Sequence, residues 1–429
     1  MIELQRIREN PEAIKQAALA KRSHVDIDKL VALDTSRREI IKEVEDLKNI
    51  RNKKSPEIAK LKKEHKDAEA ASLLEEMKRV SDKAKELDAR QADIEKEIEG
   101  ILHWIPNVPH ESVPHGESEK DNVVAGTWGE APVFDFQPKD HMQIGAALDL
   151  FDFTRGAKIA GAGFPVYKGY GAQLERALLN FMLDTHVQKN GYCEIFPPFL
   201  VNADSLFGTG QLPKSKEQMY YVGEDDLYCI PTAEVPVTNL HRDELLDAQQ
   251  LPIKYCAYSA CFRREAGSYG KDTKGFLRVH QFNKVELVKI VVPETSYDEL
   301  ELLKNNAEGI LRALGLHYRI LQLCDADLSF AAAKCYDLEA WAPGEQKFLE
   351  VSSCSNFEDF QARRMNIRYR PKAGEKPRFV HTINGSGLAT ARILVAILET
   401  YQTANGTVRV PDVLQPYMNG CKEIVTAIK

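Results

Sequence analysis

Residues 262–286 read FRREAGSYGKDTKGFLRVHQFNKVE and have the pattern of two β-strands joined by a polar, glycine-containing loop. Side chains alternate along a strand, so Arg263 and Glu265 are predicted to share one face while Arg264 points to the other. A guanidinium can hold a phosphate or carboxylate with two hydrogen bonds, and a neighbouring carboxylate can accept one from an amino group. A cross-strand ion pair on a solvated sheet is the simpler explanation of an isolated Arg-x-Glu. The stretch therefore predicts a strand–loop–strand unit and leaves its function open.

Short alternating or β-branched runs surround this unit, and few helices separate them. This arrangement favours an antiparallel sheet in an α+β domain. The predicted strands are 193–201, 254–265, 276–292, 334–341 and 348–354, and the predicted helices are 171–189, 296–314 and 387–400.

Two further stretches of this domain carry chemically suggestive residues. Glu350-Val351-Ser352-Ser353 offers a carboxylate and hydroxyls, which are hard oxygen ligands suited to Mg²⁺, although a strand end before a turn has the same composition. Residues 384–392, NGSGLATAR, predict a glycine turn that leads into an apolar helix with Arg392 in its second turn. Because position 390 is Thr and no βαβ unit follows, this is not a dinucleotide-binding fingerprint.

The N-terminal part has a different composition, since residues 28–101 are rich in Lys, Glu, Ala and Leu and nearly free of Gly and aromatics. Apolar residues there recur three and four apart, which is typical of a coiled-coil seam. Two helices of about 35 residues, each on the order of 50 Å long, are predicted to pair antiparallel around a connection near 65–69. Pro56 is expected to kink the first helix or to end it early.

The far end of this predicted hairpin is basic, although the chain as a whole has a formal net charge of −7. A solvated helix face is the usual explanation of such a charge run. The concentration of positive charge at the far end of an otherwise acidic chain favours contact with a phosphate backbone about as strongly as it favours a solvated helix face. The lysines predicted to make this contact are Lys53, Lys54, Lys60, Lys62, Lys63 and Lys66.

Several classes of protein are excluded by composition. The negative net charge argues against a non-specific nucleic-acid binder, and neither a signal peptide nor an apolar span of eighteen residues is present in the sequence. The eight cysteines form no C-x-x-C pair, so we expect reduced thiols and no zinc. Because the sequence has no apolar span of eighteen residues, we also expect no membrane association. Residues 104–141, rich in Pro and Gly, predict an extended connector between an arm, 1–103, and a globular domain, 142–429.

The order of these motifs resembles class II aminoacyl-tRNA synthetases. Phe262-Arg263-x-Glu265 with a return strand carrying Phe282 resembles their motif two, Gly385-x-Gly387-x-x-x-x-Arg392 their motif three, and 191–202 their motif one. With Thr232-Ala233-Glu234, EVSSCSNFEDFQARR and the helical arm, the similarity is to the bacterial-type seryl-tRNA synthetase family over essentially the whole chain.

The resemblance implies an α+β fold with an antiparallel helical coiled-coil arm and a class II catalytic domain on an antiparallel sheet flanked by helices. It implies ATP-dependent activation of L-serine with Mg²⁺, transfer to tRNA(Ser) and, in a host that has it, tRNA(Sec), a homodimer, and a cytoplasmic location. Arg263 would grip the α-phosphate and the serine carboxylate, and Arg392 would lie near the γ-phosphate. Glu265 would meet the adenine amino group, and Phe282 would stack on adenine. The remaining implied contacts are Thr232, Ala233, Glu234, Glu286 and Ser386 for serine, Arg264, Val279, Val351 and Ser352 for ATP, and Glu350 and Ser353 for both ATP and Mg²⁺.

Two other functions stay open at this point. A ligase of the same fold could load a small amino acid onto a carrier protein, but it would have little use for a long basic-tipped hairpin. A non-enzymatic binding protein with a dead site would be expected to lose Arg263, Glu265, Glu350 or Arg392, and all four are present.

Overall fold

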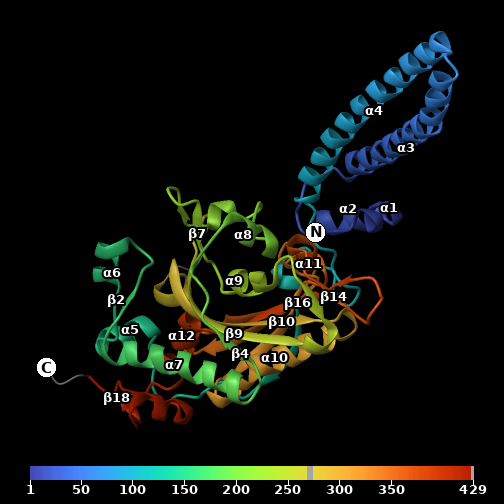
Figure 1. Ribbon diagram of the computed structural model, residues 1–429. Coiled ribbons are helices and arrows are strands. Elements are labelled where there is room, and N and C mark those ends of the chain that lie inside the picture. The colour runs from blue at the N-terminus through green and yellow to red at the C-terminus, as the bar shows by residue number, and fades with distance from the viewer. Residues whose placement is uncertain (268–273, 427–429) are drawn as a thin grey trace. The chain divides into compact units, whose positions relative to one another are not determined.

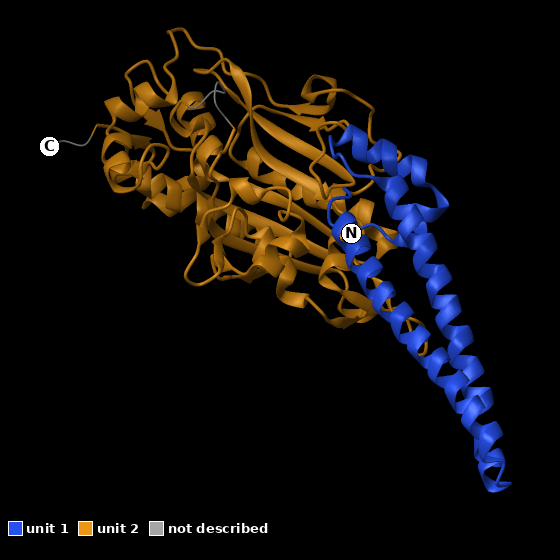
Figure 2. Cartoon of the chain, turned by 90° about the horizontal axis from the view of Figure 1, so that it is seen from above, with its two compact units in different colours: residues 1–106 blue, residues 107–429 orange. Residues whose placement is uncertain are grey.

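The computed structural model describes residues 1–267 and 274–426, which form two compact units, Met1–Pro106 and Asn107–Lys429 (Figures 1 and 2). Part of the loop quoted above, 268–273, lies outside the described residues. The helical N-terminal unit and the α+β class of the second unit confirm the predicted fold class.

The first unit is a long helical hairpin preceded by two short helices. These are α1 (Leu4–Glu9), α2 (Pro11–Ala20), α3 (Ile27–Lys63) and α4 (Asp67–Leu102). Helices α3 and α4 pack along each other, and the seam predicted from the spacing is buried at Ile40, Val44, Met77 and Leu87. The antiparallel coiled coil is therefore confirmed, and the turn at 64–66 is one to two residues tighter than expected.

Pro56 does not end the first helix, so the predicted early end is wrong, and the alternative of a kink at Pro56 stays a prediction. Helix α3 continues through Pro56 to Lys63. A proline removes one backbone hydrogen bond, but Ile58 and Leu61 beyond it are half-buried in the described structure. Packing of the apolar face is what stabilises most helices in proteins, and here it carries the helix past the proline.

The second unit is built on an eight-stranded sheet with the order β1-β11-β12-β13-β16-β10-β9-β4. Within the described residues, its neighbours are antiparallel except β4 and β9. The strands are β1 (Val123–Trp128), β4 (Cys193–Ile195), β9 (Ile253–Phe262), β10 (Gln281–Val291), β11 (Tyr318–Gln322), β12 (Lys334–Ala342), β13 (Lys347–Asn356) and β16 (His381–Ala389).

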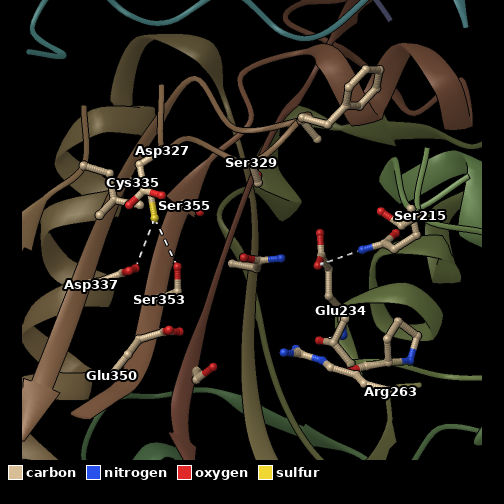
Figure 3. A pocket seen from close by; sticks show the side chains of 18 of the residues that line it. Ser215, Glu234, Arg263, Asp327, Ser329, Cys335, Asp337, Glu350, Ser353 and Ser355 are labelled. Carbon is tan, nitrogen blue, oxygen red and sulfur yellow. Dashed lines mark hydrogen bonds between the residues drawn. The ribbon is translucent and has the colours of Figure 1, made fainter. Parts of the chain in front are cut away.

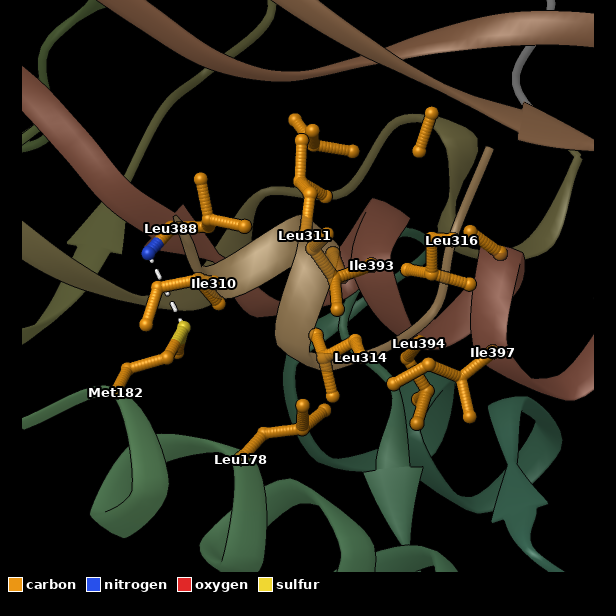
Figure 4. Packing of buried hydrophobic residues seen from close by; sticks show 14 of the residues in the cluster. Leu178, Met182, Ile310, Leu311, Leu314, Leu316, Leu388, Ile393, Leu394 and Ile397 are labelled. Carbon is orange, nitrogen blue, oxygen red and sulfur yellow. Dashed lines mark hydrogen bonds between the residues drawn. The ribbon is translucent and has the colours of Figure 1, made fainter. Parts of the chain in front are cut away.

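One face of this sheet is covered by three helices, α7 (Gly169–Gln188), α10 (Ser296–Ala313) and α12 (Thr390–Thr400). Their apolar side chains form the main core (Figure 4) with the odd-numbered residues of β10, such as Val285 and Leu287. The even-numbered residues of β10 consequently point to the opposite face.

The other helices and strands are short and surround the large sheet. They are α5 (His141–Ala147), α6 (Phe153–Ala160), α8 (Ala203–Thr209), α9 (Glu234–Thr238), α11 (Phe360–Met365), β2 (Phe151–Asp152), β3 (Val166–Tyr167), β5 (Leu200–Val201), β6 (Tyr221–Val222), β7 (Leu227–Cys229), β8 (Leu245–Asp247), β14 (Arg368–Arg370), β15 (Arg378–Phe379), β17 (Val408–Arg409) and β18 (Glu423–Ile424).

Four sequence-based boundaries differ from the structure. The glycine-containing stretch 384–389 is the end of strand β16 rather than a turn, so Arg392 lies in the first turn of α12 and not the second. Glycine normally weakens a strand, but here Gly385 and Gly387 lie so close to neighbouring side chains that a Cβ would meet them below 3.0 Å. The run 193–201 is two strands, β4 and β5. The predicted strand 276–292 begins only at Gln281, and the extended connector contains β1, the sheet's edge strand.

All eight cysteines are free thiols. None of the helices in residues 1–267 and 274–426 combines the length and the apolar character that a membrane span needs.

Candidate active site

A large cavity of about 1360 Å³ lies on the sheet face opposite the three covering helices (Figure 3). Strands β10, β12, β13 and β16 form its floor, and residues after β9 and before α9 form a wall. A smaller hollow of about 110 Å³ adjoins it and is lined by both Phe282 and Arg392. Most of the sequence-predicted site residues therefore meet in one place.

Arg263 lies just beyond the end of strand β9 and is held from both sides. Its backbone N–H donates to the His280 carbonyl at 2.9 Å, and its carbonyl lies 2.9 Å from His280 Nδ1. Its Nε donates to the Pro231 carbonyl at 3.3 Å, and its guanidinium carbon lies 5.2 Å from the centre of the Phe282 ring. The rest of the guanidinium faces the cavity, where an anion can reach it.

Arg263 and Glu265 both line the cavity, but the strand alternation that predicted this does not apply. Strand β9 ends at Phe262, and Glu265 has a left-handed backbone with φ of 50°. The Glu265 carboxylate pairs with Arg278, which also lines the cavity. Arg264 is not among the lining residues, and its backbone N–H donates to the Gln218 carbonyl.

A buried polar trio lies on the cavity floor. Lys284 Nζ donates to Thr232 Oγ1 at 2.9 Å, and that hydroxyl donates to Glu286 Oε2 at 2.8 Å. Lys284 also pairs directly with Glu286, and the three side chains are at most 7% exposed. Thr232 and Lys284 therefore hold the Glu286 carboxylate in place beside the pocket.

Glu234 is a second buried carboxyl beside this trio. Gln361 Nε2 donates to Glu234 Oε1 at 2.7 Å, and Gln211 Nε2 lies 3.5 Å from Oε2. Burial, and after it the charge of Glu286, raises the pKa of Glu234 to about 7. Ser386 lies opposite Glu286 in the β10–β16 ladder and completes this end of the cavity.

The acidic part of the cavity arises from an irregularity in strand β13. Glu350 pairs with Glu339, whereas Ser352 pairs with Leu338, so Val351 is an extra residue on one strand. This bulge brings Glu350 and Ser353, which are three apart, to the same face. Asp337 lies there too, and burial, followed by the charge of Glu350, raises its pKa well above the usual range.

Arg392 approaches this acidic part from the first turn of α12. Its Nη1 lies 3.2 Å from Glu350 Oε2 and 3.0 Å from the Glu350 carbonyl, and its Nε donates to the Leu277 carbonyl at 3.3 Å. Arg263 and Arg392 thus each bring a guanidinium to the cavity, and both also line the smaller hollow with Phe282 and Glu350.

The other predicted contacts divide into two groups. Val279, Val351 and Ser352 line the smaller hollow. Ala233 does not line either hollow, because its methyl group is buried among Val237, Ala257 and Val288.

Sequence reasoning missed several charged residues that line the cavity, among them Lys284, Arg278 and Asp337. Lys284 has the period-two spacing from Phe282 and Glu286 that could have identified it. Arg278 is a cation in the return segment of the quoted stretch, and Asp337 alternates with Cys335 and Glu339 on a predicted strand. Lys284 also donates to Thr232, which lies 52 residues away, and spacing alone does not reveal that contact.

One other cluster has metal-ligand residue types, namely His141, Glu345 and Glu399. Glu399 accepts from the backbone N–H groups of His141, Gly344 and Glu345, and it lies 3.1 Å from His141 Nδ1. The Phe276 N–H donates to His141 Nε2. The ligand atoms are therefore engaged in internal hydrogen bonds, and we regard this cluster as structural.

The arrangement is suited to joining two anions. Guanidiniums at Arg263 and Arg392 supply fixed positive charge in a cavity, where preorganised charge stabilises a crowded anionic transition state. The neighbouring trio offers an acceptor and a donor to a small polar molecule. A carboxylate bound at the trio and a phosphate bound between the arginines would meet at Arg263.

Comparisons with known proteins agree with this chemistry. Residues 1–109 match the seryl-tRNA synthetase N-terminal domain, and residues 220–401 match the tRNA synthetase class II core domain (G, H, P, S and T). The chain is 58% identical over 428 residues to a serine–tRNA ligase of Chloroherpeton thalassium, with 99% of this chain and 100% of the relative covered. It is 55% identical to that of Thermoanaerobacter pseudethanolicus, with 97% and 98% covered. Among solved structures, the seryl-tRNA synthetase of Pyrococcus horikoshii complexed with ATP matches with a TM-score of 0.94 and 38% identity over the full length of both chains.

Proposed function

The chain belongs to the seryl-tRNA synthetase family and ligates serine to tRNA with ATP, and we propose which of its residues carry each step. The observation that carries the proposal is the single cavity in which Arg263 and Arg392 lie beside the buried trio of Thr232, Lys284 and Glu286. Serine-dependent exchange of pyrophosphate into ATP tests the activation step, and charging of tRNA(Ser) tests the second step.

ATP is proposed to bind along the smaller hollow and the arginines. Phe282 stacks on adenine, Glu265 accepts from the adenine amino group, and Val279, Val351 and Ser352 enclose the base and ribose. Arg263 binds the α-phosphate, and Arg392 binds near the γ-phosphate. Arg264 and Arg278 flank this path, and binding of ATP would have to compete with the Arg278–Glu265 pair.

Serine is proposed to bind over the trio. Its carboxylate faces Arg263, and its polar groups meet Glu286, Thr232, Glu234, Ser386 and the backbone around Ala233. Glu286 Oε2 already has Thr232 and Lys284 as partners, and the serine ammonium or hydroxyl is proposed to add a further contact to this carboxylate. Alanine lacks the hydroxyl and would leave a buried acceptor unmatched, which disfavours it strongly.

Mg²⁺ is proposed to be held by Glu350 and Ser353. The donor set fits, because the bulge at Val351 places a carboxylate and a hydroxyl, both hard oxygen ligands, on one face. When bound with ATP, the ion would neutralise phosphate charge. We expect no zinc requirement.

Replacing Glu265 and Glu286 by glutamine, one at a time, should separate ATP binding from serine binding. Glu286→Gln keeps the side-chain volume beside Lys284, and we expect it to raise the KM for serine about ten- to a hundredfold and to erode the preference over alanine. Glu265→Gln should instead raise the KM for ATP by a similar factor. Exchange kinetics over both substrates measure this, and the same KM rising in both variants would contradict the assignment.

The two units are proposed to divide the labour. Residues 1–103 bind tRNA(Ser), and tRNA(Sec) in a host that has it, through Lys53, Lys54, Lys60, Lys62, Lys63 and Lys66 near the hairpin end, while 104–141 connect and 142–429 catalyse. Lys60 and Lys66 each lie within 4.0 Å of Glu64, so phosphates would have to compete for them. A carrier-protein ligase is not favoured, because the chain matches tRNA ligases over nearly its whole length.

We further propose that the protein is a cytoplasmic homodimer. The motif-one segment offers Phe196, which is 76% exposed beside the edge strand β4, and the adjoining Leu200, 45% exposed. An unpaired edge strand with apolar side chains favours a partner. Sedimentation at micromolar concentration should give a species near twice 48.4 kDa, and a single species near 48.4 kDa would contradict the dimer.

A further inference from the structure

Glu175, on the core side of the sheet, is a buried carboxyl that the reaction as described does not use. It lies in helix α7 and is 6% exposed. Burial raises its pKa to about 7. Among the described residues its Oε2 has no hydrogen-bond partner, so an ionised carboxylate there would be costly.

The hydrogen bonds of Glu175 reach two elements that line the ATP hollow. Asn283 Nδ2 donates to Glu175 Oε1 at 2.8 Å, and Thr390 Oγ1 lies 2.6 Å from the same oxygen. Thr390 Oγ1 also donates to the Asn283 carbonyl at 3.0 Å. Strand β10 and the start of helix α12 are therefore tied together around one carboxyl group.

Both tied residues are next to side chains of the proposed ATP site. Asn283 lies between Phe282 and Lys284 on β10 and points to the opposite face. Thr390 is the first residue of α12, and Arg392 follows in the same turn. A shift of either backbone segment would therefore move Phe282 or Arg392 directly.

The protons available for these hydrogen bonds indicate whether Glu175 is ionised or neutral. A threonine hydroxyl has one proton, and the Asn283 carbonyl can only accept. If Thr390 donates to that carbonyl, the short contact to Glu175 needs a proton from the carboxyl group. When Glu175 is neutral, its O–H can donate to Thr390 and the Thr390 O–H to the Asn283 carbonyl, so both contacts of the Thr390 hydroxyl are hydrogen bonds.

We propose that Glu175 is a positioning residue for ATP activation, which as a neutral acid fixes the spacing between Phe282 on β10 and Arg392 on α12. The proposal rests on the ATP-binding roles given above to those two residues. Glu175 itself touches no substrate, and glutamine, which is neutral and can both donate and accept, should replace it.

The test compares variants of the full-length protein in serine-dependent pyrophosphate exchange. Glu175→Gln should stay within about threefold of the parent in rate and in both KM values. Glu175→Leu, similar in size but without hydrogen bonds, should lower the rate and raise the KM for ATP together by about tenfold or more. Thr390→Val should act in the same direction, and the double variant Glu175→Leu/Thr390→Val should be no worse than the more severe single variant.

A matched control separates positioning from general stability. Glu308 is a buried glutamate of α10, 5% exposed and bonded to Arg312 and Tyr318, away from the cavity lining. Glu308→Leu should lower the melting temperature without changing the KM for ATP. The proposal is overturned if Glu175→Leu changes only the melting temperature, or if Glu175→Gln is as defective as Glu175→Leu. If Arg392→Ala also has no effect, the assigned ATP site is at fault rather than Glu175.

Discussion

Replacing Arg263 by alanine should lower the rate of serine activation by on the order of 10²- to 10³-fold, with smaller changes in either KM. Arg263 lies between the proposed serine and ATP sites and is held in place by His280 and Pro231. Its charge is most needed when the carboxylate and the α-phosphate crowd together in the transition state. Pyrophosphate exchange over a matrix of serine and ATP concentrations measures the effect.

The lysine variant is the control for this prediction. Arg263→Lys keeps the charge but lacks the planar fork, so it should recover part of the rate. If Arg263→Ala raised only the KM for ATP and left the rate unchanged, Arg263 would be a peripheral phosphate contact. A thermal melting curve of each variant checks whether losing the contact between Arg263 and the Phe282 ring has unfolded the protein.

Removing the helical hairpin should abolish most tRNA charging while serine activation stays nearly intact. Deletion of residues 36–93 with a short glycine linker cuts α3 and α4 where they face each other, since Arg37 and Glu95 approach to 3.9 Å. The described residues that line the cavity belong to the second unit. Equal loss of exchange and charging would contradict the division of labour.

A milder change of the hairpin tests how it contacts tRNA. Exchange of Lys60, Lys62, Lys63 and Lys66 for glutamine should reduce the salt dependence of tRNA binding, by about 0.7 to 0.9 in the log–log slope for each lost phosphate contact. The matched control exchanges Lys42, Lys78, Lys85 and Lys96, which are exposed elsewhere on α3 and α4. An unchanged slope in the first variant, or an equal reduction in both, would argue against contact at the hairpin end.

Periodicity predicted the arm well because a coiled-coil seam is a local property. The spacing that includes Met77 and Leu87 needs no information from elsewhere in the chain. Pro56 was the exception, since packing along α4 outweighs its missing hydrogen bond.

The catalytic unit was predictable in its motifs and less so in its geometry. Glu350 and Ser353 share a face only because of the bulge at Val351, and the bulge depends on pairing with a remote strand. The glycines of β16 suggested a turn, but they lie in a strand where neighbouring side chains leave no room for a Cβ. Lys284 and Glu175 acquire their roles from Thr232 and Thr390, which lie 52 and 215 residues away in sequence.

The most direct test of the account is pyrophosphate exchange into ATP by the full-length protein with serine, alanine or threonine as the only amino acid. The proposed pocket predicts exchange with serine. Alanine leaves a buried acceptor unmatched, so its kcat/KM for exchange should be lower by several orders of magnitude. A gap of this size is typical of sites that bind a hydroxyl group. Glu286→Gln should narrow this gap. Equal exchange with serine and alanine, or a gap that Glu286→Gln leaves unchanged, would contradict the assignment of the buried trio as the serine site.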